Sequence, residues 1–109
     1  MTFDEYQKRT GETAKYPAIG ERCIYPVLGL AGEAGEVAET VKKIFRDSGG
    51  HVSLEKKDEL LKELGDVLWY VSQVATEFKL SLGDIAQANI TKLADRAARG
   101  VIHGSGNNR

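Results

Sequence analysis

Two short acidic motifs recur 30 residues apart in this 109-residue chain, and together they could hold a metal ion. The segments EAGEVA and ELGDVL share the order acid, apolar, glycine, acid, valine, apolar. Residues three positions apart lie on one face of an α-helix, so each motif directs two carboxylates the same way. The four acids are Glu33, Glu36, Glu63 and Asp66. Two carboxylates about 4 Å apart repel by about 4 kcal/mol at an effective dielectric constant of about 20, so clustering would require a cation.

A glycine stands between the two acids of each motif, at Gly35 and Gly65. Each glycine costs about 1 kcal/mol relative to alanine in a helix interior. Their matching positions predict that two helix backbones approach closely there, which would bring the two acid pairs together. For one pair taken alone, a solvated charged face is the commoner explanation.

The type of ligand favours Mg²⁺, with Mn²⁺ as a substitute. Carboxylate oxygens without neighbouring His or Cys suit a hard divalent cation better than zinc. A di-iron bundle would need Glu-x-x-His motifs, and neither His51 nor His103 follows an acid by three residues. Because Mg²⁺ commonly shares its coordination sphere with substrate phosphates, the motifs point to phosphate chemistry.

A basic face further along the chain complements the acids. Asn89, Lys92 and Arg96 are spaced by three and four residues, so they share one face of a helix. Such cations could neutralise phosphate oxygens; a solvated basic face is the alternative. The chain has no Walker-type glycine loop and no Ser-His-Asp set, so a covalent route is not supported.

The elements that must position these residues are four helices, predicted at about 3–14, 26–47, 54–78 and 82–98. Apolar residues recur at steps of three and four in the last three segments, and no strand pattern competes. We therefore expect an all-α, four-helix bundle forming a single domain over residues 1–109. A core this thin favours burial against a partner subunit. The Gly- and Asn-rich segment 100–109 is predicted to be a flexible or substrate-covering tail.

Composition restricts the partners and the compartment. The net charge of -1 and the pI of about 6.1 do not favour nucleic acid or anionic membrane as a partner. The single Cys23 excludes an internal disulfide and a cysteine-rich zinc site, and it fits a reducing compartment. The first residues contain acids and no apolar run, so we expect no signal peptide and a cytoplasmic location.

The runs GLAGEAGEVAE and KELGDVLWYV resemble the MazG-like nucleotide pyrophosphohydrolases of the all-α NTP pyrophosphohydrolase superfamily. That family is marked by E-x-x-E on one helix and E-x-x-D on the next, and the similarity extends from about Val27 to Arg96. The resemblance implies Mg²⁺-dependent hydrolysis of a (deoxy)nucleoside triphosphate to the monophosphate and diphosphate. It further implies a homodimer or homotetramer and a house-cleaning role toward noncanonical or surplus nucleotides.

The resemblance also implies roles for individual residues. The metal ligands would be Glu33, Glu36, Glu63 and Asp66, with Glu36 and Glu63 also as catalytic residues, although which acid activates water stays open. The residues contacting phosphate and sugar would be Asn89, Lys92 and Arg96. Candidates for the nucleobase are Trp69, Tyr70 and Gln7; a core or dimer-interface role is the alternative for the aromatic residues.

Two further interpretations stay open at this point. Related dUTP/dUDP hydrolases and phosphoribosyl-ATP pyrophosphohydrolases share the acidic motifs and differ in the base pocket. From another class, a non-catalytic helical dimer could bind nucleotide or a protein partner and carry the acids as structural residues.

Overall fold

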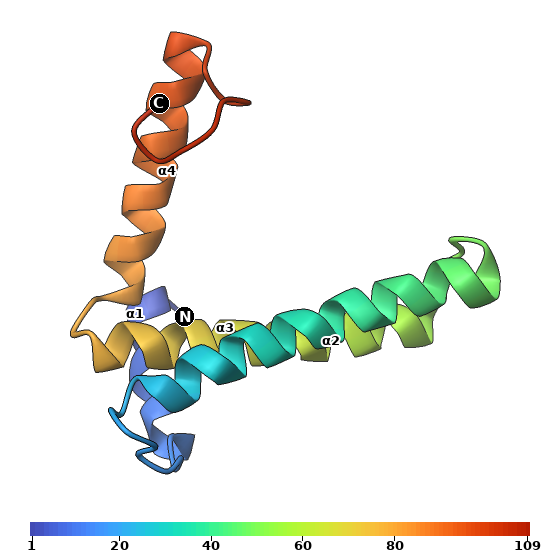
Figure 1. The fold of residues 1–109 in the computed structure, drawn as a ribbon, viewed down its shortest axis with the longest axis horizontal. Helices are drawn as coiled ribbons and strands as arrows, with labels where there is room; N and C mark the ends of the chain where they lie inside the picture. Colours follow the sequence, from blue (N-terminus) through green and yellow to red (C-terminus); the bar gives the residue numbers. More distant parts are fainter.

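The computed structural model describes residues 1–109 and contains helices only (Figure 1). The four α-helices are α1 (Phe3–Thr10), α2 (Ile24–Ser48), α3 (Leu54–Glu77) and α4 (Leu82–Arg99), with a 3₁₀ turn η1 (Gly11–Thr13) after α1. This confirms the all-α class and the four expected helices. None of the helices is both long and apolar enough to cross a membrane.

Local capping interactions set the helix boundaries. The hydroxyls of Thr2, Ser53 and Ser81 each accept a hydrogen bond from the backbone N–H three residues ahead, at 3.0, 3.1 and 3.1 Å. At the other ends of α2 and α4, Gly49 and Gly100 adopt left-handed φ values of 61° and 73°, a conformation that glycine takes without steric cost. The first helix is shorter than predicted because its last residues form the 3₁₀ turn.

Helices α2 and α3 form a long antiparallel hairpin that carries both acidic motifs (Figure 1). The close approach within it occurs at Gly29, where an added side-chain carbon would collide with the ring of Tyr70. Around Gly35 and Gly65, by contrast, an added carbon would meet nothing within 4 Å. The prediction that the motif glycines mark a close approach of backbones is therefore wrong for this chain.

Helix α1 lies across the end of the hairpin and ties it to α4. The Gln7 side chain donates to Thr76 Oγ1 (3.1 Å) and to the Leu80 carbonyl (2.9 Å), and it accepts from the Leu82 N–H (2.7 Å). The Asp4 carboxylate accepts from the Gly83 N–H at 3.0 Å. These bonds hold the turn between α3 and α4, from which α4 departs.

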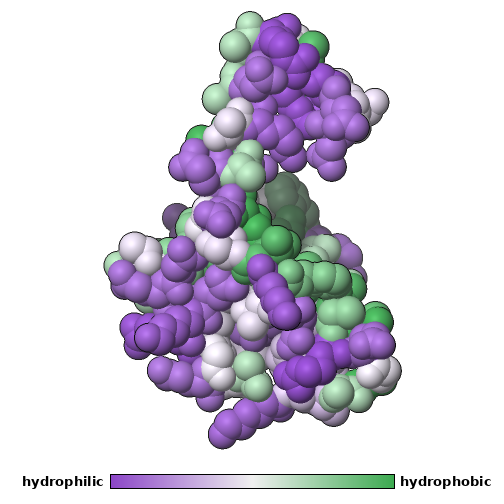
Figure 2. Space-filling model, turned by 90° about the vertical axis from the view of Figure 1, so that its left-hand side faces the viewer, coloured by the Kyte–Doolittle hydropathy of each residue, from purple (hydrophilic) through white to green (hydrophobic).

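Helix α4 points away from the hairpin, and the C-terminal segment folds back onto it (Figure 1). The apolar seam of α4 is uncovered in one chain: the exposed fractions are 62% for Ile90 and 38% for Leu93. Only nine of the 109 residues are buried, and the side view shows apolar surface near the base of the projecting arm (Figure 2). The helices are those expected, but within one chain they pack less completely than a closed bundle.

Candidate active site

The four acids of the two motifs lie in one electrostatic environment between α2 and α3. Burial raises the pKa of Glu33, and the charges of Asp66, Glu36 and Glu63 raise it further. None of the four carboxylates takes part in an ion pair. The hairpin thus gathers four acids whose mutual repulsion is not offset by any cation of the chain.

Glu63 is held by a residue that the sequence did not single out. The hydroxyl of Thr40, which is only 4% exposed, donates to Glu63 Oε1 at 2.7 Å. Glu59 Oε1 lies farther from the same hydroxyl, at 3.5 Å. The second oxygen, Glu63 Oε2, is buried and has no hydrogen-bond partner. Thr40 follows Glu33 by seven residues and so repeats its helix face, which was the signal available in the sequence.

The chemistry of these acids fits a hard divalent cation. All the ligand atoms offered are carboxylate oxygens, and Glu63 Oε2 is a buried acceptor without a donor, which is costly unless a partner is supplied. As arranged in one chain, no group of three or more His, Cys, Asp or Glu side chains closes around a common point that could hold a metal ion. The four acids therefore offer suitable ligand atoms, but one chain does not arrange three of them around a single metal position.

The three nucleobase candidates lie in different surroundings. The pKa of Tyr70 is raised first by burial, and its ring packs against Gly29 in the helix interface. Gln7 uses its amide to tie α1 to the α3–α4 turn. Trp69 donates from Nε1 to Thr13 Oγ1 at 3.0 Å, and its ring meets that of Tyr70 edge-on at 5.0 Å between centroids. Of the three, only Trp69 lines a pocket.

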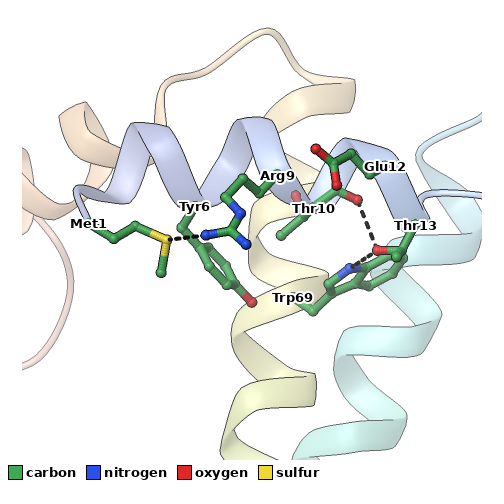
Figure 3. A pocket seen from close by; sticks show the side chains of 7 residues that line it. All are labelled: Met1, Tyr6, Arg9, Thr10, Glu12, Thr13 and Trp69. Carbon is green, nitrogen blue, oxygen red and sulfur yellow. Dashed lines mark hydrogen bonds between the residues drawn. The ribbon is translucent and has the colours of Figure 1, made fainter.

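That pocket lies between α1, η1 and α3 and has a volume of about 350 Å³ (Figure 3). It is lined by Met1, Tyr6, Arg9, Thr10, Glu12, Thr13 and Trp69. The pKa of Tyr6 is raised by burial and then by the charge of Asp66. Asp66 precedes Trp69 by three residues on α3 and so shares its helix face, which places one of the four acids next to the pocket.

The predicted phosphate residues lie on α4, apart from the acids of the same chain (Figure 1). Asn89 is exposed, and Lys92 donates to Asn107 Oδ1 at 3.3 Å. Arg96 is 4% exposed and donates from Nη2 to the carbonyls of Gly106 (3.2 Å) and Asn107 (2.8 Å). Its buried Nε has no partner. One chain therefore does not bring the basic face and the acids together.

Desolvation lowers the pKa of Arg96, and the charges of Arg109 and Arg99 lower it further. The Arg109 guanidinium is turned back onto the main chain and donates to the carbonyls of Val101 (3.0 Å) and Ile102 (2.8 Å). The positive charges of Arg96, Arg99 and Arg109 therefore lie close together at the end of α4 and its tail.

Comparison with known proteins finds a family match over most of the chain. The sequence profile of the MazG nucleotide pyrophosphohydrolase domain matches residues 26–101, which include both acidic motifs and the basic face. The gene 37 protein of Mycobacterium phage L5 is 47% identical, with both chains covered completely. The uncharacterized protein YvdC of Bacillus subtilis (strain 168) is 36% identical over 72 residues, or 62% of this chain and 68% of that protein. No solved structure matches the chain significantly.

Proposed function

Since the chain belongs to the MazG nucleotide pyrophosphohydrolase family, we propose that it hydrolyses a (deoxy)nucleoside triphosphate to the monophosphate and diphosphate, with Mg²⁺ as cofactor. The observation that carries this proposal is the set of four unpaired carboxylates on the hairpin, with Glu63 Oε2 buried and without a partner. Such a set is a liability for a structural protein and an asset for a cation site.

The side chains divide the work as follows. Glu33, Glu36, Glu63 and Asp66 would hold Mg²⁺, which when bound screens phosphate charge and lowers the pKa of water. Thr40 fixes one oxygen of Glu63 and leaves the other free to act as a ligand. Glu36 and Asp66 are both exposed; of the two we assign Glu36, as the resemblance implies, to accept the proton of the attacking water. That water bonds to the α-phosphorus as the bond to the bridging oxygen breaks, and diphosphate leaves.

The α4 cations would act on the phosphates of the substrate. Lys92 and Arg96 make no ion pair within the chain. The charge of Lys92 is available to an anion, whereas Arg96 is buried against the tail carbonyls and would contact a phosphate only after the tail moves. Because α4 projects away from the acids of its own chain, we propose that a second copy brings its α4 to the hairpin. The uncovered apolar seam at Ile90 and Leu93 supports such a homodimer or homotetramer.

The test is product analysis with a panel of NTPs and dNTPs, including dUTP and dUDP, in Mg²⁺ or in EDTA. We expect nucleoside monophosphate plus diphosphate, formed only with the metal. Phosphoribosyl-ATP in the same panel distinguishes the related pyrophosphohydrolases. Release of orthophosphate from a triphosphate would contradict the assigned cleavage position.

A non-catalytic nucleotide-binding dimer is the second candidate, because no three acids close around a metal position in one chain. The two candidates differ in the linkage between metal and stability. A metal-holding site raises the melting temperature with Mg²⁺ by mass action, and Glu63→Gln should remove that rise. A stable oligomer with no carboxylate-dependent response to Mg²⁺ and no turnover would favour the binding module.

A further inference from the structure

The pocket between α1 and α3 has two aromatic side chains and a hydroxyl-rich floor (Figure 3). Trp69 is fixed by its hydrogen bond to Thr13. The floor residue Thr10 is 5% exposed. Its hydroxyl donates a hydrogen bond to the Gln7 carbonyl (2.7 Å) and forms a second hydrogen bond with Ser72 Oγ (2.9 Å). The hydroxyls of Thr10 and Thr13 already have hydrogen-bond partners, and the ring of Trp69 offers a flat surface on which a planar ligand can stack.

The position of the pocket relative to the acids restricts what such a ligand can be. Asp66 and Trp69 are three residues apart on α3 and so share a face. The charge of Asp66 reaches Tyr6 on the other wall. A ligand seated beside Trp69 would thus lie next to one of the four acids, Asp66.

Two charged residues that line the pocket, Arg9 and Glu12, have no ion-pair partner within the chain. Arg9 makes no ion pair, and its one side-chain hydrogen bond is to Met1 Sδ at 3.9 Å, a weak acceptor. The carboxylate of Glu12 forms neither an ion pair nor a hydrogen bond with another side chain. The Arg9 guanidinium is therefore available to a ligand as a hydrogen-bond donor, and the Glu12 carboxylate as an acceptor.

We propose that this pocket receives the nucleobase, and that Arg9 and Glu12 select bases that carry an exocyclic amino group. The proposal rests on the proposed hydrolysis of nucleotides at the neighbouring acids. Arginine donates to ring-nitrogen and carbonyl acceptors, while a carboxylate accepts from an amino group such as that of cytosine. Uracil and thymine have no amino group, and carbonyl oxygens flank their single ring N–H. The Glu12 carboxylate would face those lone pairs and disfavour both bases.

Trp69 is the only tryptophan of the chain, so its fluorescence reports directly on this pocket. The probes are deoxycytidine, deoxyadenosine and deoxyguanosine, compared with thymidine and deoxyuridine, all in EDTA. Free tryptophan corrects for absorption by the bases. A second series uses the α,β-imido analogues of dCTP and dTTP with Mg²⁺, and inorganic tripolyphosphate serves as the phosphate-only control.

We expect a saturable change with amino-bearing bases, at affinity about tenfold higher than for thymidine, since a good pair of base-edge hydrogen bonds discriminates by about that factor. Tripolyphosphate should leave the fluorescence of Trp69 unchanged. Glu12→Gln should narrow the difference between deoxycytidine and thymidine, because an amide can also donate to a carbonyl. Arg9→Ala should lower the affinity for all the bases. Glu5→Gln, on α1 but outside the pocket, should have no effect, and circular dichroism checks the helices of each variant.

Equal affinity for thymidine and deoxycytidine, or a Glu12→Gln variant with unaltered preference, would overturn the assignment of the base edge. A fluorescence change caused equally by tripolyphosphate, or none with any base, would overturn the pocket itself. Turnover is measured separately. Base-selective binding without hydrolysis would retain this inference and reject the proposed function, whereas hydrolysis without any response of Trp69 would do the reverse.

Discussion

The α2–α3 hairpin and the α4 arm carry opposite charges that remain uncompensated within one chain. On the hairpin, burial and the charges of the other three acids raise the pKa of Glu33, and none of the four carboxylates forms an ion pair. On the arm, Lys92 and Arg96 face oxygen atoms of the tail and meet no carboxylate. Arg99 alone pairs with an acid there, Asp95, at 2.8 Å. Each region supplies what the other lacks.

The two regions also differ in how they are packed. The hairpin is closed by contacts such as Tyr70 against Gly29, whereas the apolar seam of α4 is left uncovered. Secondary structure forms in both because it depends on local sequence. Burial is incomplete in both regions: the hairpin leaves Leu28, Phe45 and Leu61 64%, 66% and 69% exposed, and the single projecting helix has no second layer to pack against. In the proposed function the hairpin holds the metal, and the arm supplies cations to the hairpin of a second copy.

The largest expected effect is on the acidic side. Glu63→Gln should lower the rate of nucleotide hydrolysis more than about a hundredfold. Loss of a residue that only orients a metal ligand typically lowers activity about tenfold to a hundredfold, and loss of the ligand itself should have a larger effect. Steady-state product analysis measures it. In EDTA the melting temperature should not fall, since one repelling charge is removed. Glu55→Gln, at the start of α3, is the matched control; equal activity of the two variants would remove the four-acid site.

Support of Glu63 by Thr40 comes next. Thr40→Val keeps the shape but leaves Glu63 Oε1 without its donor, so apparent Mg²⁺ affinity should fall about tenfold to a hundredfold. Titration of thermal stability with Mg²⁺ measures it without turnover. Thr40→Ser should restore most of the affinity because the hydroxyl returns. If Ser and Val behave alike, the hydrogen bond does not position the carboxylate.

On the arm, a charge placed in the apolar seam tests assembly. Ile90→Asp should cost one chain little, because this residue is 62% exposed, yet it should dissociate an oligomer that buries α4. Analytical ultracentrifugation measures the mass, and activity should fall with it. Ala88→Asp adds the same charge on the opposite face of α4. A monomeric, active wild-type chain would show that the hairpin needs no second arm.

The motif glycines provide a smaller test. Gly35→Ala and Gly65→Ala should each raise the free energy of unfolding by up to about 1 kcal/mol, because an added carbon has open space around it. Chemical denaturation measures the gain. Lower activity in these stabilised variants would indicate that substrate or a second copy occupies that space. Unchanged activity would leave the glycines without a functional reason.

The smallest expected effect concerns the pH dependence of stability. The native pKa of Glu33 lies above its ordinary value of 4.5, so the folded state binds more protons between the two values. The free energy of unfolding should therefore fall as pH rises through this window in EDTA. Glu33→Gln should remove that part of the slope, as measured by denaturation at several pH values. A slope that Mg²⁺ does not reduce would separate Glu33 from the metal.

The sequence by itself determined the helices and which acids share a helix face. Caps at Thr2, Ser53 and Ser81, glycine stops at Gly49 and Gly100, and apolar periodicity are local signals, so each boundary followed within a few residues. The repeated acidic motif identified the family for the same reason, because spacing along one helix already sets which side chains share a face.

Only the tertiary structure decided which residues meet across helices. It placed the close approach at Gly29 rather than Gly35, assigned Thr40 to Glu63, and used Gln7 to hold a turn. It also directed α4 away from the acids (Figure 1). These outcomes depend on the relative rotation and direction of helices far apart in sequence. Periodicity reveals which face of a helix is apolar, but only long-range packing selects the partner of that face.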